Sequence, residues 1–254
     1  MKKNILFLCF LGALLMASSC RSHYGLSSIE RTRILIDKRY DAMPDNEAQH
    51  FIAPYKGQVD SIMSPVAGSI DHYMAAHRPE SDLSNLLADI LVWGAGKFNE
   101  KADFAVYNIG GIRAGFAKGK VTYGDVLDVA PFENKICLLT LSGEKVMELF
   151  QNIAAVKGEG VSHGVQLVIT RDGKLKSALL NGKEIDLKAD YRISTLDYLA
   201  QGNDKLDAFK AKTNMFSPQD KENDVRFIIM DYFREKAKQG EVVNSKVEGR
   251  ITIE

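Results

Sequence analysis

The sequence of 254 residues lacks the features that mark several classes of protein. Proline and glycine are not in excess, which excludes a long disordered or fibrous tract. Thirty-three basic residues balance 33 acidic ones, and no stretch holds a long basic run. Because affinity for phosphate backbones needs a basic face, polymeric nucleic acid is excluded as a partner. The composition, 45% hydrophobic and 26% charged, is sufficient for one good core.

The N-terminus carries a targeting signal. Lys2 and Lys3 precede an apolar segment, residues 5–16, that is too short to cross a bilayer. Small residues then lead to Cys20, and this arrangement resembles a bacterial lipoprotein signal, although Ala17 stands where leucine is commoner. The alternative is an ordinary signal peptide with an incidental cysteine. We predict a signal peptide over residues 1–19, acylation of Cys20, and a lipid-anchored protein in the periplasm or on the cell surface.

The other cysteines indicate no thiol chemistry. Cys9 would leave with the signal peptide, and Cys137 lies alone in the apolar run 136–141. A lone cysteine in a predicted strand is more often a small core residue than a catalytic thiol, which needs a base in a polar setting.

The mature chain is predicted to form one domain after a polar tether. The tether covers residues 20–46, in which Ile34–Ile36 could form one strand, and the domain covers residues 47–254, where no linker or repeat interrupts the pattern. Apolar spacing predicts helices and strands that alternate with hairpin turns at Asp172–Gly173 and Asn181–Gly182. The fold class expected is α+β or layered α/β. The helices expected are 59–76 (interrupted at Pro65), one through Leu86–Trp93 that Ser84 or Asn85 caps, one after Ser142, and 225–238; the strands are 104–107, 135–141, 165–170, 175–180 and 191–196.

The segment Asn108-Ile109-Gly110-Gly111-Ile112-Arg113 is the first candidate for chemistry. Paired glycines after a strand allow the backbone to approach a ligand closely. An arginine follows at once, and its planar guanidinium donates two parallel hydrogen bonds to a phosphate. Taken alone, the segment could equally be a tight turn with a surface arginine.

Two more motifs follow in order. Residues 124–127 read Gly-Asp-Val-Leu and lead to Pro131-Phe132-Glu133-Asn134, and later Tyr198 stands six residues before Asp204 in a small-residue loop. This order resembles the C-terminal domain of the 5′-nucleotidase and UDP-sugar hydrolase family, with its N-x-G-G-I-R turn, G-D-V-x-x-x-x-P-F-x-N segment and G-G-D loop. The resemblance runs from about residue 53 to the end and implies a layered α/β/β/α domain. Further matches are Glu80, Asn85, Asp89 and Leu141-Ser142-Gly143.

The resemblance implies a nucleotide site. Phe132 and Tyr198 match the two aromatic residues that sandwich the base, and Asp204 matches the aspartate that binds the ribose hydroxyls. Arg113 and Asn108 match groups on the phosphate and base side, and Asn134 matches a polar residue beside the first aromatic. From the residues alone, Phe132 could be a core residue, Tyr198 a strand aromatic and Asp204 a turn former.

The chain departs from the family pattern at two places. Asn203 replaces the second glycine of the G-G-D loop, so a Cβ appears where the backbone would approach the ligand. His77 stands where a second phosphate-side arginine is expected, and Arg78, one residue later, is the candidate substitute.

The motifs that would supply metals do not match. In the family a separate metallophosphatase domain holds two metals through D-x-H, G-D-x-x-D and G-N-H-[DE] motifs, and both ions serve hydrolysis. Here Gly124–Asp128 imitates one motif but lies inside the specificity segment, and the five histidines are scattered. We therefore predict no catalytic residue and no metal site in this chain, with divalent metals only in a partner.

The function expected is that of a nucleotide-specificity domain. A separately encoded metallophosphatase would complete a hydrolase for nucleoside 5′-monophosphates. One alternative is a non-enzymatic lipoprotein that binds nucleosides or nucleotides, and another is a relic whose pocket binds nothing.

Overall fold

The computed structural model describes residues 24–254, so the predicted signal peptide and Cys20 lie outside the described residues. Residues Ile52–Glu254 form one compact unit. Before it, the described segment has the short 3₁₀ helix η1 (Lys38–Tyr40), which begins after Asp37. The strand considered at Ile34–Ile36 is not formed: these residues are exposed and have no strand partner. Among residues 24–254, no helix combines the length and the hydrophobicity that a membrane span requires.

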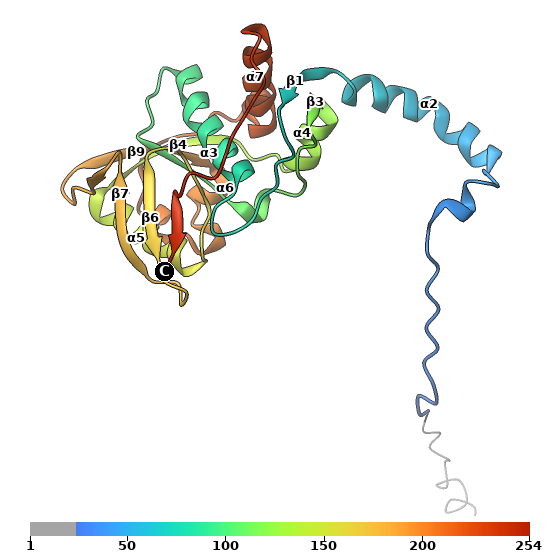
Figure 1. Cartoon of the computed structure of the whole chain (residues 1–254), viewed down its shortest axis with the longest axis horizontal. Coiled ribbons are helices and arrows are strands. Elements are labelled where there is room, and N and C mark those ends of the chain that lie inside the picture. Colours follow the sequence, from blue (N-terminus) through green and yellow to red (C-terminus); the bar gives the residue numbers. More distant parts are fainter. Residues whose placement is uncertain (1–23) are drawn as a thin grey trace, which may run out of the picture. The chain divides into compact units, whose positions relative to one another are not determined.

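Helices and strands alternate along the chain (Figure 1). The helices are α2 (Asn46–Met63), α3 (Asp82–Ala95), α4 (Tyr123–Val129), α5 (Gly143–Ala155), α6 (Asp197–Ala200) and α7 (Val225–Lys238). The strands are β1 (Val66–Ile70), β2 (Phe104–Tyr107), β3 (Gly119–Thr122), β4 (Ile136–Ser142), β5 (Gly160–Val161), β6 (Val165–Ile169), β7 (Leu175–Leu180), β8 (Lys183–Glu184), β9 (Asp190–Leu196), β10 (Thr213–Phe216) and β11 (Ile251–Ile253).

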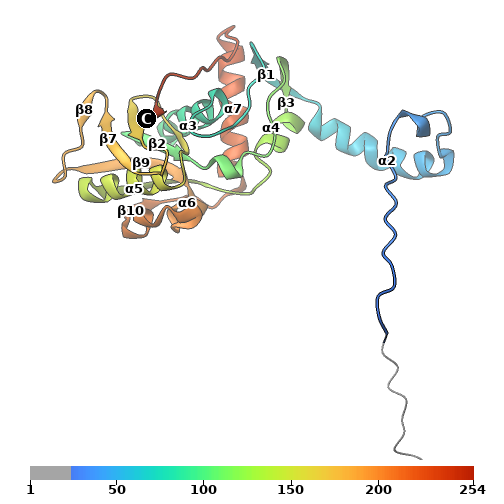
Figure 2. The ribbon, with the colours of Figure 1, turned by 60° about the horizontal axis from the view of Figure 1, so that its bottom comes forward.

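A five-stranded mixed sheet in the order β10-β4-β9-β2-β5 forms the centre of the compact unit (Figure 2). β2 and β9 run parallel, and β4 pairs antiparallel with β9 over its whole length, from Ile136 opposite Leu196 to Ser142 opposite Asp190. All four residues of β2 are buried, as expected for an interior strand that is covered on both faces.

A second sheet has four strands in the order β11-β6-β7-β8. The predicted hairpins are confirmed: β6 pairs antiparallel with β7, and β7 pairs with β8. Asn181 and Gly182 both adopt positive φ, 52° and 74°, as a two-residue turn with the twist of the flanking strands requires. Helix α5 packs against β4 and β9 of the first sheet and against β7 of the second. The expected α+β fold class is confirmed.

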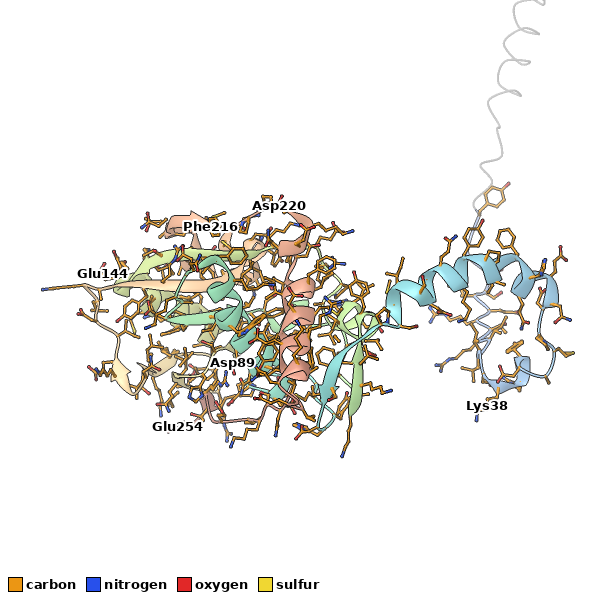
Figure 3. All side chains as sticks on the ribbon, turned by 90° about the horizontal axis from the view of Figure 1, so that it is seen from above. Lys38, Asp89, Glu144, Phe216, Asp220 and Glu254 are labelled. Carbon is orange, nitrogen blue, oxygen red and sulfur yellow. The ribbon has the colours of Figure 1, made fainter. Side chains whose placement is uncertain are left out.

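The C-terminal segment is fixed by one charged group on α3 and one just before it. Asp89, labelled in Figure 3, binds both terminal nitrogens of the buried Arg250 at 2.8 Å. Glu80 accepts the amide of Asn85 at 2.6 Å and the backbone N–H of Glu248 at 2.8 Å. These family-matching residues in and just before α3 therefore hold the chain that leads into β11.

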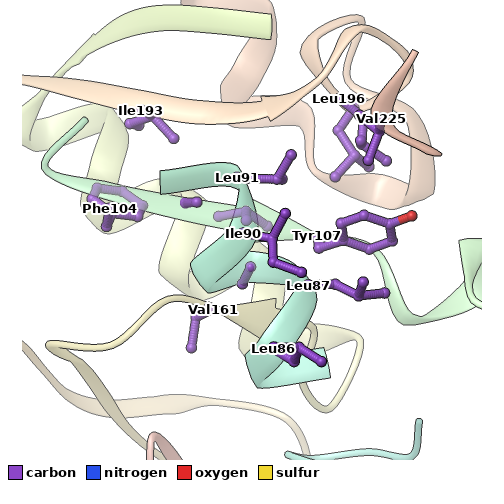
Figure 4. Close-up of a cluster of buried hydrophobic side chains, with 14 of the residues drawn as sticks. Leu86, Leu87, Ile90, Leu91, Phe104, Tyr107, Val161, Ile193, Leu196 and Val225 are labelled. Atoms are coloured by element: carbon purple, nitrogen blue, oxygen red, sulfur yellow. The ribbon is translucent and has the colours of Figure 1, made fainter. Parts of the chain in front are cut away.

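Helix α3 lies on the central sheet and supplies much of the core (Figure 4). Leu87, Ile90 and Leu91 are fully buried, and the Ser194 hydroxyl of β9 donates to the Leu91 carbonyl at 2.8 Å. The helix was predicted to begin at Ser84 or Asn85, and this is wrong. Ser81 caps it, because the Ser81 and Ser84 side chains each bond the other's backbone N–H in a capping box.

The helix predicted over residues 59–76 is also wrong in its second half. Helix α2 ends at Met63, and Val66–Ile70 forms β1, which pairs antiparallel with β3. Pro65 ends the helical pattern. The backbone of α7 lies close to Gly68, where an added Cβ would be 2.8 Å from the Phe233 carbonyl oxygen. Pairing with distant residues thus overrides the local apolar spacing. The predicted helix over residues 225–238 is confirmed as α7.

Candidate functional site

Three loops meet at one edge of the central sheet. β2 and β9 are parallel neighbours, so the chain leaves both at the same edge, and antiparallel β4 begins there because Ile136 lies opposite Leu196. The three predicted motifs follow β2, precede β4 and follow β9. Polar loops at the carboxyl ends of neighbouring parallel strands are a common location for ligand sites. The loops enclose a pocket of about 220 Å³ lined by Asn108, Gly110, Gly111, Phe132, Asn134, Tyr198 and Asp204.

Asp204 is the polar centre of this pocket. One carboxylate oxygen accepts the Asn108 amide at 2.6 Å, and the other accepts the Tyr198 hydroxyl at 2.9 Å. The hydrogen bond to Asp204, with some burial, raises the pKa of Tyr198, so the phenol stays protonated and donates. A carboxylate has about four lone-pair sites, so Asp204 retains room for two further donors.

The loop that carries Asp204 is held in an unusual backbone conformation. Gly202, Asp204 and Lys205 have φ values of 84°, 55° and 65°. Glycine and aspartate are among the residues that tolerate this left-handed region best. The Asn203 amide donates to the Tyr198 carbonyl at 2.7 Å, and Asn203 is not one of the pocket-lining residues. The side chain that replaces the family's glycine therefore stabilises the loop.

Asn108 requires glycine at position 111. Because the Asp204 carboxylate only accepts hydrogen bonds, the Asn108 nitrogen must face it, and the oxygen must face Gly111. A Cβ on Gly111 would lie 2.7 Å from that oxygen. The Asn108 side chain is 4% exposed, and its oxygen has no hydrogen-bond partner.

The two aromatic residues offer ring surface to a ligand. Phe132 is 49% exposed and Tyr198 is 38% exposed, and they line the pocket from the loop before β4 and from the short helix α6 after β9. Exposed aromatic rings beside a hydrogen-bonding carboxylate suit a ligand in which a flat ring is joined to a part that carries hydroxyl groups. The alternative that Phe132 is a core residue does not fit this exposure.

The two arginines lie outside the pocket lining. Arg113 is exposed beside the pocket and donates to the Gly110 carbonyl at 3.4 Å. Arg78 forms an ion pair with Glu159, a buried carboxylate that also accepts the backbone N–H of Ile109. The structure thus gathers Asn108, Phe132, Asn134, Tyr198 and Asp204, places Arg113 next to them, and leaves Arg78 outside, paired with Glu159.

Glu159 is a site-forming residue that the sequence analysis missed. It is 1% exposed, and its burial raises the pKa of its carboxyl, an effect opposed by the Ile109 amide and Arg78. The signal was a carboxylate between two glycines, Gly158 and Gly160. Such a residue is buried only when groups elsewhere in the chain satisfy it.

Among residues 24–254, no group of three or more histidine, cysteine, aspartate or glutamate side chains is arranged to hold a metal ion. Cys137 is buried and free, and burial raises the pKa of its thiol to about 11.

Comparison with known proteins identifies the family. Residues 66–211, which include every motif of the pocket, match the model of the 5′-nucleotidase C-terminal domain. The chain belongs to this family. The predicted resemblance to the family's C-terminal domain is therefore confirmed.

The relatives are much longer than this chain. The trifunctional nucleotide phosphoesterase protein YfkN of Bacillus subtilis is 28% identical over 236 residues, 85% of this chain but 16% of the relative. Protein UshA of Escherichia coli is 34% identical over 107 residues, 41% of this chain and 19% of the relative.

Solved structures show the same fold. The 5′-nucleotidase precursor from Thermus thermophilus aligns with a TM-score of 0.69 at 24% identity, over 84% of this chain and 44% of that protein. The NAD nucleotidase of Haemophilus influenzae aligns with a TM-score of 0.59 at 20% identity, over 82% of this chain and 41% of that protein. The chain spans less than half the length of each of these four proteins.

Proposed function

We propose that this chain is the nucleotide-binding specificity domain of a 5′-nucleotidase-type hydrolase that serves nucleotide catabolism. The observation that carries the proposal is the convergence of Phe132, Tyr198 and Asp204 on one pocket at the sheet edge. The two rings would stack on the base, and the free lone pairs of Asp204 would accept the two ribose hydroxyls. Asn108 and Asn134 would contact the ligand's polar edges.

The phosphate would lie on the side of Arg113. A guanidinium that is exposed beside the pocket can bind a phosphate without displacing a protein partner, since Arg113 makes only a long bond to Gly110. Arg78 is already paired with Glu159 and would contribute charge to the same side at longer range.

Arg113→Ala is expected to weaken the binding of AMP by about 1.5–3 kcal/mol, roughly 10- to 150-fold, because charge-assisted hydrogen bonds are lost. Adenosine, which lacks the phosphate, should change by less than about 0.5 kcal/mol. Calorimetric titration of both ligands measures the difference, and Arg171→Ala, an exposed arginine between β6 and β7, is the matched control. Equal losses for AMP and adenosine would remove Arg113 from the phosphate side.

We also propose that a separately encoded metallophosphatase supplies the two metal ions and completes the enzyme. The support is the division of motifs: those in this chain match the specificity domain, and none of its histidines stands in a metal motif. The competing function is a non-enzymatic lipoprotein that presents nucleosides or nucleotides to another protein, which needs the same pocket.

The mature chain with AMP and manganese, zinc or cobalt is expected to release no phosphate, because two-metal hydrolysis needs both ions held in place. Phosphate release is measured with and without a chelator. Robust turnover that the chelator abolishes would show that the chain is an enzyme by itself. Release that appears only when a separately encoded metallophosphatase is added would distinguish the hydrolase component from the binding lipoprotein.

Acylation of Cys20 would anchor the protein outside the cytoplasm, in the periplasm or on the cell surface. A fatty-acid probe fed to cells is expected to label the wild type and Cys137→Ala but not Cys20→Ala, because the Cys137 thiol is buried. Equal labelling of Cys20→Ala and the wild type would exclude the lipid anchor at this residue.

A further inference from the structure

A buried arginine with unpaired donors lies near Glu133, in the loop that carries Phe132. Arg226, in the first turn of α7, is 7% exposed, and its Nε and one terminal nitrogen have no hydrogen-bond partner. Buried side-chain donors in folded proteins almost always have an acceptor, so two vacant donors on one guanidinium require an explanation.

The charges around Arg226 do not balance. Asp224 is 2% exposed and is the buried anion closest to Arg226, but one of its oxygens is taken by Lys135. Its other oxygen lies 3.9 Å from the Arg226 Nε, beyond hydrogen-bond reach. Two cations therefore share one buried carboxylate.

The second counter-ion is Glu133, which follows Phe132 directly. Its carboxylate is 82% exposed and lies 4.0 Å from a terminal nitrogen of Arg226, about 1 Å too far for a hydrogen bond. The far end of the loop is fixed, because the Val225 N–H donates to the Asn134 carbonyl at 2.8 Å. The segment from Asp220, labelled in Figure 3, leads through Asp224 into α7. Arg226 and Glu133 thus connect the start of α7 to the loop that carries Phe132.

We propose that Arg226 and Glu133 form a ligand-dependent latch that positions Phe132 over a bound base. This inference rests on the proposed nucleoside site. When a base stacks on Phe132, the loop moves inward by about 1 Å, and the Glu133 carboxylate accepts hydrogen bonds from the vacant Arg226 donors. These bonds then stabilise the loop over the ligand, so Arg226 and Glu133 are positioning residues that need not touch the ligand.

Glu133→Gln and Arg226→Met are each expected to weaken the binding of adenosine about tenfold, which corresponds to about 1.4 kcal/mol. The double variant should lose no more than either single variant, because both remove the same interaction. Adenosine is the chosen probe because it is uncharged and therefore insensitive to the net charge of the site. Glu222→Gln, an exposed carboxylate two residues before Asp224, is the matched control and should bind as the wild type does.

The melting temperature without ligand separates positioning from structural support. Glu133→Gln should leave it unchanged, since the side chain is exposed and lies 4.0 Å from Arg226, too far for a hydrogen bond. Arg226→Met should not lower it, because replacing a poorly satisfied buried charge with an apolar side chain is often neutral or stabilising. Amide exchange at residues 132–135 should slow when adenosine binds to the wild type and not when it binds to Glu133→Gln.

The outcomes are distinguishable. A wild type that binds no adenosine at millimolar concentration overturns the proposed function, and the latch with it. A wild type that binds, with variants that bind equally well or with additive losses, overturns the latch alone. Loss of adenosine binding in Arg226→Met that follows a lower melting temperature, with Glu133→Gln unaffected, also overturns it and leaves Arg226 as a structural residue.

Discussion

Simultaneous replacement of Phe132 and Tyr198 by alanine is expected to abolish measurable adenosine binding. Each ring that stacks on a base contributes roughly 1–3 kcal/mol, so each single variant should lose that much and the double variant roughly 2–6 kcal/mol. Both rings are at least one-third exposed, Phe132 in a loop and Tyr198 in the four-residue helix α6, so the fold does not depend on them. Calorimetric titration of adenosine into each variant measures the losses.

Tyr198→Phe separates stacking from hydrogen bonding. It retains the ring and removes only the hydroxyl that donates to Asp204 at 2.9 Å. A small change in Tyr198→Phe beside a large one in Tyr198→Ala would assign the affinity to the ring. Circular dichroism and melting temperature should stay at wild-type values, and losses of binding that follow losses of folding would return both residues to a structural role.

Local sequence patterns correctly predicted those helices and strands whose local preference is not overridden by contacts with distant residues. The hairpin β6–β7 has alternating residues and its own turn, and α7 has a complete amphipathic pattern from Val225 to Lys238, so both were predicted correctly. β1 was not, because Val66–Ile70 owes its strand conformation to β3, about fifty residues later in the sequence. β3 itself is a short strand whose partner is equally distant.

The candidate site divides in the same way. The residues that line the pocket were named from three motifs, because each motif is continuous in the sequence. Their convergence follows from the parallel pairing of β2 with β9, which no motif encodes. Glu159 and Arg226 were missed since their significance comes from contacts with residues at least 50 positions away in the sequence. Family resemblance supplied the link between motifs, whereas supporting residues became visible only in the fold.

Gly158→Ala is expected to destabilise the fold by roughly 2–6 kcal/mol. Gly158 has φ of +112°, and this backbone strain costs a side-chain-bearing residue about 1–3 kcal/mol. The added Cβ would also lie 2.3 Å from the Pro79 carbonyl oxygen and 2.7 Å from its Cα, and overpacking of this kind typically costs about 1–3 kcal/mol more. Thermal unfolding should show a decrease in melting temperature on the order of 10 °C for a domain of this size.

Gly182→Ala is the control that isolates the collision with Pro79. Gly182 also has positive φ, +74°, but a Cβ there would have nothing within 4 Å, so only the backbone strain of about 1–2 kcal/mol applies. Equal decreases for the two variants would mean that the chain around Pro79 moves aside without cost. A larger decrease in melting temperature is expected for Gly158→Ala. If the close approach of residues 79 and 158 also sets the position of Glu159, the adenosine affinity of this variant should be reduced even at temperatures at which it is still folded. That carboxylate holds the Ile109 amide, and through it the turn whose glycines line the pocket.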